Sequence, residues 1–232
     1  NAMLFFGLLR EWLGNRRIAF WAVLFWAWHP LRVESVAWIS ARKDVLSGLF
    51  FLLCLGSYAR SFPKGRRATG WYHAAVGFLG LGLMSKSTLM ATPAIWLLLD
   101  VWPLGRVTWS RAGLRKMPEL IAEKWLGWGL CAASAALSLF GHQATDSLPT
   151  VSLGTRMARV GIHYGFYLWR TLVPRNLAVL YADIEPTAGW LAVSILLLLA
   201  ATAGFWRWRR VRPGVLVGWL WYLGLLLPVS GL

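Results

Sequence analysis

Charged residues are scarce in this sequence. Only 14% of its 232 residues are Asp, Glu, Lys or Arg, whereas 58% are hydrophobic, and the mean hydropathy is +0.54. A soluble domain of this length cannot shield so much apolar surface from water. The composition therefore argues against an ordinary soluble globular protein and predicts that apolar segments face lipid.

Cysteine is nearly absent, and the motifs of common cofactor sites are missing. The two cysteines, Cys54 and Cys131, lie in apolar runs without metal-ligand spacing, which predicts packing roles. His142 and His163 also lack partners at such spacing. No G-x-x-x-x-G-K-[ST] or G-x-G-x-x-G loop occurs. We therefore expect neither a metal ion nor a bound cofactor.

Acidic residues are few, because nine Asp and Glu stand against 24 Lys and Arg, giving a net charge of +15. Such an excess suggests a nucleic-acid partner where the basic residues gather on one exposed face. Here they lie in short segments between apolar runs, as the positive-inside rule describes. The charge pattern therefore predicts membrane lipid as a partner and no nucleic acid.

Apolar runs recur along the whole chain, and several approach the roughly 20 residues that cross a bilayer as a helix. Many of the 17 tryptophans flank these runs, where an indole ring sits at the membrane interface. We predict an all-α, polytopic transmembrane helical bundle of about seven full spans after a partial one. The expected ranges are 1–13 (partial), 18–33, 45–59, 71–84, 87–101, 124–140, 187–205 and 214–230.

Basic segments set the expected orientation of these spans. Those predicted to be cytoplasmic, which carry sixteen of the 24 Lys and Arg, are 10–17, 60–67, 106–124 and 207–212. The segment 156–181 then lies between two outer ends. Because His163 and Arg170 interrupt its apolar stretch, we expect an amphipathic helix on the outer interface. The alternative is a full crossing that breaks the charge rule.

The densest charged segment is HPLRVESVAWISARKD, from His29 to Asp44. Pro30 disfavours helix at His29, so the chain is expected to turn there. The segment is richer in charge than a connection between two helices requires. Its candidate functional residues are His29, Arg32, Glu34, Arg42, Lys43 and Asp44. The alternatives are helix capping by Asp44 and headgroup anchoring by Arg42 and Lys43.

Two further segments on the expected outer side carry cations. Lys86 lies in the tight break MSKSTLMATP, where it either snorkels to the surface or contacts an anionic group. Arg170 and Arg175 lie in the segment 156–181, where they either anchor to lipid headgroups or line a phosphate-recognising pocket. Together with the first segment they predict an outer cavity with cations for phosphate and carboxylates for proton transfer. A lipid-phosphate-linked sugar would suit such a cavity, although the residues alone leave the substrate open.

Four blocks of the sequence resemble the O-mannosyltransferase-like family, in which a GT-C type membrane glycosyltransferase is joined to tetratricopeptide repeats. In the family's order they are HPLRVESVAWISARKDVLSGLFFLLCL, SKSTLMATPAIWLLLDVWPLGR, RMARVGIHYGFYLWRTLVPRNLAVLY and VGWLWYLGLLLPVSGL. The six candidates from His29 to Asp44 match the first block, and Lys86 matches the second. The resemblance thus extends over nearly the whole chain.

This resemblance implies transfer of a sugar, often mannose, from a polyprenyl-phosphate carrier to a hydroxyl of a protein or glycan acceptor. Glu34 and Asp44 are then the catalytic candidates, and the cations with His29 are candidates for binding the lipid phosphate or sugar. The reaction would take place on the non-cytoplasmic face. We expect a multi-pass protein of a bacterial inner membrane with a periplasmic active face.

Two features depart from the family. GT-C enzymes generally place their catalytic acid in the first outer loop, and this chain begins too late to contain it; tetratricopeptide repeats are also absent. Both ends look incomplete, so we predict a single membrane domain, 1–232, from a longer glycosyltransferase. Glu34 or Asp44 would then have a supporting role. The alternatives are a transporter or flippase of a lipid-linked substrate and a non-catalytic membrane scaffold.

Overall fold

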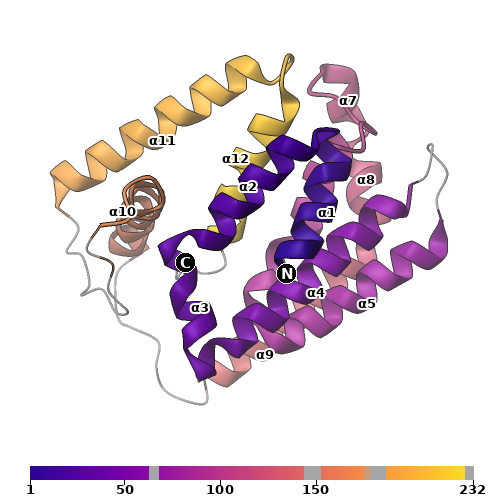
Figure 1. The fold of residues 1–232 in the computed structure, drawn as a ribbon, viewed down its shortest axis with the longest axis horizontal. Coiled ribbons are helices and arrows are strands. Elements are labelled where there is room, and N and C mark those ends of the chain that lie inside the picture. Colours follow the sequence, from indigo (N-terminus) through magenta and orange to yellow (C-terminus); the bar gives the residue numbers. More distant parts are fainter. Residues whose placement is uncertain (63–67, 144–152, 176, 178–186, 228–232) are drawn as a thin grey trace. The chain divides into compact units, whose positions relative to one another are not determined.

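The computed structural model describes residues 1–62, 68–143, 153–175, 177 and 187–227. Over these residues the chain is helical and forms no strand (Figure 1), which confirms the all-α prediction. The chain divides into two compact units, Asn1–Ser138 and Leu139–Leu232. The prediction that residues 1–232 form a single membrane domain is not tested by this division and stays a prediction.

The helices of the first unit follow the expected spans, with short helical turns between them. In chain order they are α1 (Ala2–Leu13), α2 (Arg16–Trp28), η1 (Pro30–Arg32), α3 (Val33–Ala37), η2 (Ile39–Ala41), α4 (Arg42–Arg60), α5 (Thr69–Ser85), η4 (Ser87–Ala91), α6 (Thr92–Val101), α7 (Arg111–Arg115), α8 (Met117–Glu123) and α9 (Trp125–Gln143). The expected span 18–33 ends early, at Trp28, because the chain turns before Pro30. The expected span 87–101 begins as a 3-10 turn.

Local chemistry explains how the first hairpin forms. Gly14, with φ of 62°, ends α1 in the left-handed conformation that a residue without Cβ adopts easily. The side chain of Asn15 then accepts hydrogen bonds from the backbone N–H groups of Arg17 and Ile18, which caps α2. These two positions turn the chain back on itself between α1 and α2.

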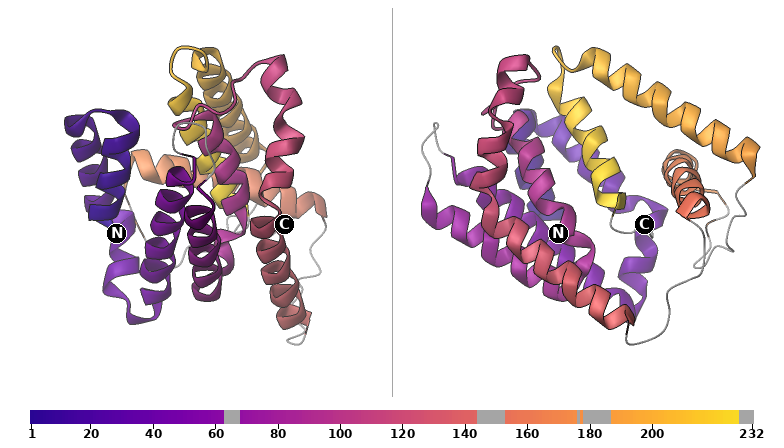
Figure 2. Two further views of the ribbon diagram at one scale, coloured as in Figure 1. Left: turned by 90° about the vertical axis from the view of Figure 1, so that its right-hand side faces the viewer. Right: turned by 180° about the vertical axis from the view of Figure 1, so that it is seen from behind.

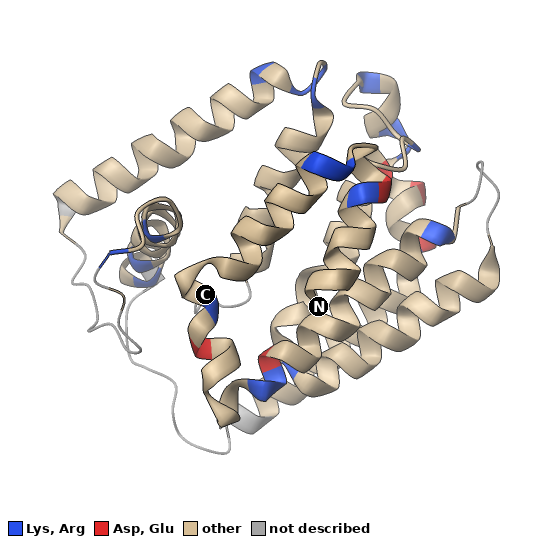
Figure 3. Ribbon diagram, viewed as in Figure 1, with Lys and Arg blue, Asp and Glu red and all other residues tan. Residues whose placement is uncertain are grey.

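The core of the first unit forms where α4 and α5 lie side by side (Figures 1 and 2). Cys54, Leu55 and Leu79 are buried here, and Trp96 of α6 is fully buried as well. Cys131 of α9 is also buried, so the packing roles predicted for both cysteines are confirmed. Lys, Arg, Asp and Glu residues lie near the ends of these helices, whereas the middles carry none (Figure 3).

The second unit contains α10 (Leu153–Leu172), α11 (Ala188–Trp208) and α12 (Pro213–Leu226). Tyr164 of α10 donates a hydrogen bond to the carbonyl of Leu223 at 2.7 Å, and Tyr222 donates one to the carbonyl of Tyr164 at 2.7 Å. These reciprocal bonds attach α10 to α12. The segment 156–181 is thus a helix up to Leu172, and its residues 176 and 178–181 lie outside the described residues.

One helix among the described residues, Gly189–Trp208, is long and apolar enough to cross a membrane. Ser87–Val101, Trp125–Phe140 and Pro213–Leu226 are apolar but shorter. Much of the apolar surface nevertheless remains exposed: Trp190, Leu196 and Leu199 of the long helix are 64%, 65% and 62% exposed. The number of spans therefore remains a prediction.

Candidate functional site

The charged segment begins with the turn expected at His29. His29 is buried, adopts an extended backbone conformation, and its Nδ1 accepts a hydrogen bond from the N–H of Leu31 at 3.3 Å. This bond caps η1, whose first residue is Pro30. The imidazole also packs edge-on against Phe25, with ring centroids 5.4 Å apart. In this structure His29 thus shapes the turn.

Within the same segment, Arg32 and Glu34 are both exposed. The guanidinium of Arg32 lies 4.9 Å from the ring centroid of Trp26, a cation-π contact that keeps it close to α2. Glu34 lies in the first turn of α3 and is exposed, with no ion-pair partner among the described residues. The catalytic role of Glu34 and the substrate-binding role of Arg32 therefore stay predictions.

The start of α4 concentrates positive potential. Its cap residue is Ala41, which offers no side-chain acceptor, and the backbone N–H of Arg42 donates to the carbonyl of Ile39 in the preceding turn η2. Arg42 and Lys43 are both exposed in this first turn. Asp44 lies in the same turn, where a carboxylate is favoured by the helix dipole, but it is not the capping residue. The interpretation of Asp44 as the N-terminal cap of this helix is therefore wrong, because the cap is Ala41.

The structure brings together two of the predicted blocks, because Lys86 pairs with Asp44. Its Nζ lies 2.6 Å from Oδ1 of the carboxylate, and the two side chains are 35% and 29% exposed. Lys86 ends α5 in an extended conformation, which turns its side chain back to the start of α4. The anionic group expected near Lys86 is, in this structure, Asp44 itself.

Arg170 and Arg175 belong to the second unit. The guanidinium of Arg170 donates a hydrogen bond to the carbonyl of Arg175 and lies 4.9 Å from the ring centroid of Phe166. Arg175 is exposed just beyond the end of α10. Their part in phosphate binding stays a prediction.

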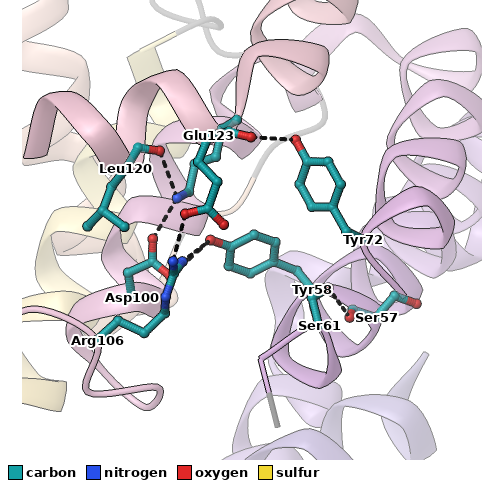
Figure 4. Close-up of polar contacts among 9 residues, drawn as sticks. Ser57, Tyr58, Ser61, Tyr72, Asp100, Arg106, Leu120 and Glu123 are labelled. Carbon is teal, nitrogen blue, oxygen red and sulfur yellow. Dashed lines mark hydrogen bonds and ion pairs between the residues drawn. The ribbon is translucent and has the colours of Figure 1, made fainter. Parts of the chain in front are cut away.

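A second charged cluster, which we call the buried network, was not anticipated from the sequence (Figure 4). Asp100 at the end of α6 is fully buried, and its Oδ2 lies 2.6 Å from Nζ of Lys124, also fully buried. Its Oδ1 accepts hydrogen bonds from Arg106 at 2.8 Å and from the phenol of Tyr58 at 2.9 Å. Arg106 reaches on to Oε2 of Glu123 at 2.6 Å. Two carboxylates thus balance two cations.

The loop after α6 positions Arg106 for this cluster. The backbone N–H of Arg106 donates to the carbonyl of Asp100 at 2.7 Å, and Gly105 supplies the positive φ of 62° that the tight return requires. Burial lowers the pKa of the Arg106 guanidinium, but the hydrogen bond to Glu123 and the charge of Asp100 raise it more, to a net value above the ordinary one. Arg106 is therefore a fixed cation that links α6 to α8.

Neighbouring groups complete the cluster. Tyr72 of α5 donates a hydrogen bond to the carbonyl of Glu123 at 3.1 Å, and Lys124 donates one to the carbonyl of Leu120 at 3.0 Å. The ring of Tyr58 stacks on Trp96 with centroids 4.8 Å apart. When one partner of a buried, hydrogen-bonded pair of charges is removed, the free energy of unfolding falls strongly. The arrangement is that of a structural junction between α4, α5, α6 and α8.

One sequence signal pointed toward the buried network. Asp100 closes the apolar run before it, and a carboxylate in such a place needs a partner. Arg106 and Lys124 were instead counted among cytoplasmic cations that set the orientation. The position of Asp100 thus indicated that it needs a partner, but the sequence did not show which residues supply one.

The two charged clusters differ in what they can do chemically. Asp44, Lys86, Arg42 and Lys43 are partly or fully exposed, so they can reach a solute phosphate or hydroxyl group. In the buried network the pair of Asp100 and Lys124 is fully buried and bonded internally, whereas the side chains of Arg106 and Glu123 are only 20% and 16% exposed. Among the described residues, no three His, Cys, Asp or Glu side chains gather as metal ligands. The start of α4 with Lys86 is therefore the candidate site.

Comparison with known proteins gives partial matches. The chain is 28% identical over 144 residues, 56% of its length, to mouse (Mus musculus) protein O-mannosyl-transferase TMTC2. It is 49% identical over 51 residues, 22% of its length, to human (Homo sapiens) protein O-mannosyl-transferase TMTC1, and 37% identical over 81 residues to human TMTC2. Over these segments the chain is homologous to TMTC1 and TMTC2.

These matches support the resemblance to the O-mannosyltransferase-like family, while the GT-C type and the truncation remain predictions. The aligned segments span 17% of mouse TMTC2 and 6% of human TMTC1, so the chain corresponds to a small part of either relative. No protein-family model and no solved structure matches the chain. The relatives come from mouse and human, and they give no support to a bacterial inner membrane.

Proposed function

We propose that this chain is part of a membrane glycosyltransferase. It would transfer a sugar from a polyprenyl-phosphate carrier to a hydroxyl group of a protein acceptor, and the relatives point to mannose as that sugar. The names of the relatives, protein O-mannosyl-transferases, support a mannosyl donor and a protein acceptor. The apolar composition and the long apolar helix of the second unit support a membrane location. We propose that the catalytic face lies on the non-cytoplasmic side.

The observation that carries the proposal is the pairing of Lys86 with Asp44 beside Arg42 and Lys43. Three cations and the start of a long helix favour an anionic group at this place. A phosphate that docks here would compete with Asp44 for the ammonium group of Lys86. The competition would leave the Asp44 carboxylate available to accept a proton.

The reaction breaks the bond between the anomeric carbon of the sugar and the phosphate oxygen of the carrier. A new bond forms between that carbon and the acceptor oxygen, and the acceptor's proton passes to a carboxylate. Lys86, Arg42 and Lys43 offset the charge of the departing lipid phosphate. Asp44 and Glu34 are proposed in supporting roles at this step, with Asp44 the better placed because it contacts a cation.

Donor binding is the first test. Lys86→Met and Arg42→Ala should each weaken binding of a fluorescent polyprenyl-phosphate mannose by about tenfold, because each removes one charge-assisted contact. Arg111→Ala is the matched control, since Arg111 is an exposed cation of α7 away from α4. Equal donor affinity in all three variants and the unchanged chain would contradict the proposal.

Transfer of radiolabelled mannose from the carrier to a serine- or threonine-containing peptide tests the activity itself. Incorporation that falls in Lys86→Met supports a transferase. Movement of the donor across a vesicle membrane without transfer would instead support a transporter or flippase. If the chain shows no transfer and no movement of the donor but still binds a partner protein, the result would support a scaffold.

A further inference from the structure

The second unit contains a cavity of about 550 Å³ between α10 and α11. Its walls are mainly apolar and include Phe166, Trp169, Trp190, Val193 and Leu197. One charged side chain, Arg170, lines it among the described residues. A cavity with long apolar walls and one cation is suited to an amphiphile with an anionic head.

The close approach of the two helices at one point helps to define this cavity. A Cβ atom on Gly165 would lie 2.5 Å from Oγ of Ser194, and one on Gly161 would lie 3.1 Å from the side chain of Leu191. These small residues let the helices touch, as they do in membrane helix pairs. Next to this contact the larger rings of Trp169 and Trp190 line the open space.

Charge on α10 has one sign only. The helix carries Arg156, Arg159 and Arg170 but no Asp or Glu. Arg170 is held in place by its cation-π contact with Phe166 and by its hydrogen bond to the carbonyl of Arg175. Its planar guanidinium is well suited to a phosphate group.

We propose that this cavity holds one acyl chain of an anionic bilayer phospholipid, with the lipid phosphate bound by Arg170. A volume of about 550 Å³ is of the size that holds a single small ligand. The much longer tail of a polyprenyl carrier does not fit within it, which favours a phospholipid as the occupant. The inference does not depend on the glycosyltransferase proposal, because it concerns residues of the second unit alone.

The test measures lipid retained by the purified full chain in neutral detergent. The chain is mixed with phosphatidylglycerol or phosphatidylcholine of identical acyl chains, and bound lipid is counted by native mass spectrometry. The unchanged chain should retain phosphatidylglycerol about tenfold better, since the choline cation of phosphatidylcholine offsets the charge of its phosphate and repels the Arg170 guanidinium. Arg170→Gln should lower phosphatidylglycerol to the level of phosphatidylcholine.

Matched variants test binding of the lipid headgroup and binding of the acyl chain separately. Val193→Trp fills the cavity and should reduce retention of both lipids, whereas Arg210→Gln, at an exposed arginine of the same unit, should change neither. An unchanged headgroup preference in Arg170→Gln, or full retention in Val193→Trp, overturns the proposal. Displacement of the lipid by equimolar polyprenyl phosphate would assign the cavity to the donor, and displacement by glycerol phosphate would assign it to free phosphate; either result overturns it too.

Discussion

The two ends of α4 handle charge in opposite ways. At its start, Asp44 pairs with Lys86 while both side chains remain about one-third exposed. Near its end, Tyr58 donates a hydrogen bond to Asp100, which is fully buried with Lys124. By the rise of an α-helix, the positions of Asp44 and Tyr58 are about 21 Å apart along the axis.

This difference distinguishes a binding site from a structural ion-pair network. An exposed ion pair contributes little to stability, so its partners can be exchanged for a ligand at small cost. A buried pair has already lost its hydration, so removal of one partner leaves a charge that nothing compensates. The start of α4 is therefore able to bind, whereas the buried network holds the first unit together.

The sharpest way to break the comparison is to ask whether the two ends lie on opposite sides of a membrane. Ser40→Cys, just before α4, should react with an impermeant thiol reagent only from outside. Ala112→Cys, in α7, should react only from the cytoplasmic side; both positions are exposed, and the native Cys54 and Cys131 are buried. Labelling of both positions from one side would refute the predicted topology.

The largest energetic difference is expected for Lys124. Lys124→Met should lower the free energy of unfolding by about 3–5 kcal/mol, because Asp100 would stay buried without its ammonium partner. Denaturant unfolding in detergent measures the effect. The double variant Asp100→Leu with Lys124→Met should lose less stability than the sum of the two single variants, and additive losses would argue against the buried pair.

A smaller loss is expected for Arg106→Lys. The lysine retains the charge but lacks the fork that reaches Asp100 and Glu123 together, so about 1.5–3 kcal/mol of stability should be lost. The same unfolding measurement applies, with Arg115→Lys, at an exposed residue of α7, as the control. Equal stability of the two variants would show that Arg106 does not bridge.

The smallest change in stability is expected at the other end of α4. Lys86→Met should alter the free energy of unfolding by less than about 1 kcal/mol, since the pair with Asp44 is partly solvated. Its effect on donor binding should nevertheless be the tenfold loss given above. A destabilisation as large as that of Lys124→Met would mean that the Asp44 pair is also structural.

Much of the helical layout was predictable from local sequence. The turn at His29 followed from Pro30, and the expected span 71–84 differs from α5 (Thr69–Ser85) by two residues at its start and one at its end. The short helices α7 and α8 were not expected, because a polar segment without a long apolar run gives no periodic signal. The candidate segment before α4 was expected as a loop, yet it contains η1, α3 and η2.

The sequence by itself determined where the apolar helices lie and which segments carry charge, because propensity, periodicity and turn chemistry act over a few residues. Only the tertiary structure decided that Lys86 meets Asp44 and that Lys124 meets Asp100. Each pair joins different helices, and the side chains meet only after those helices pack. Burial, which separates the exchangeable pair from the fixed one, is likewise a property of the packed chain.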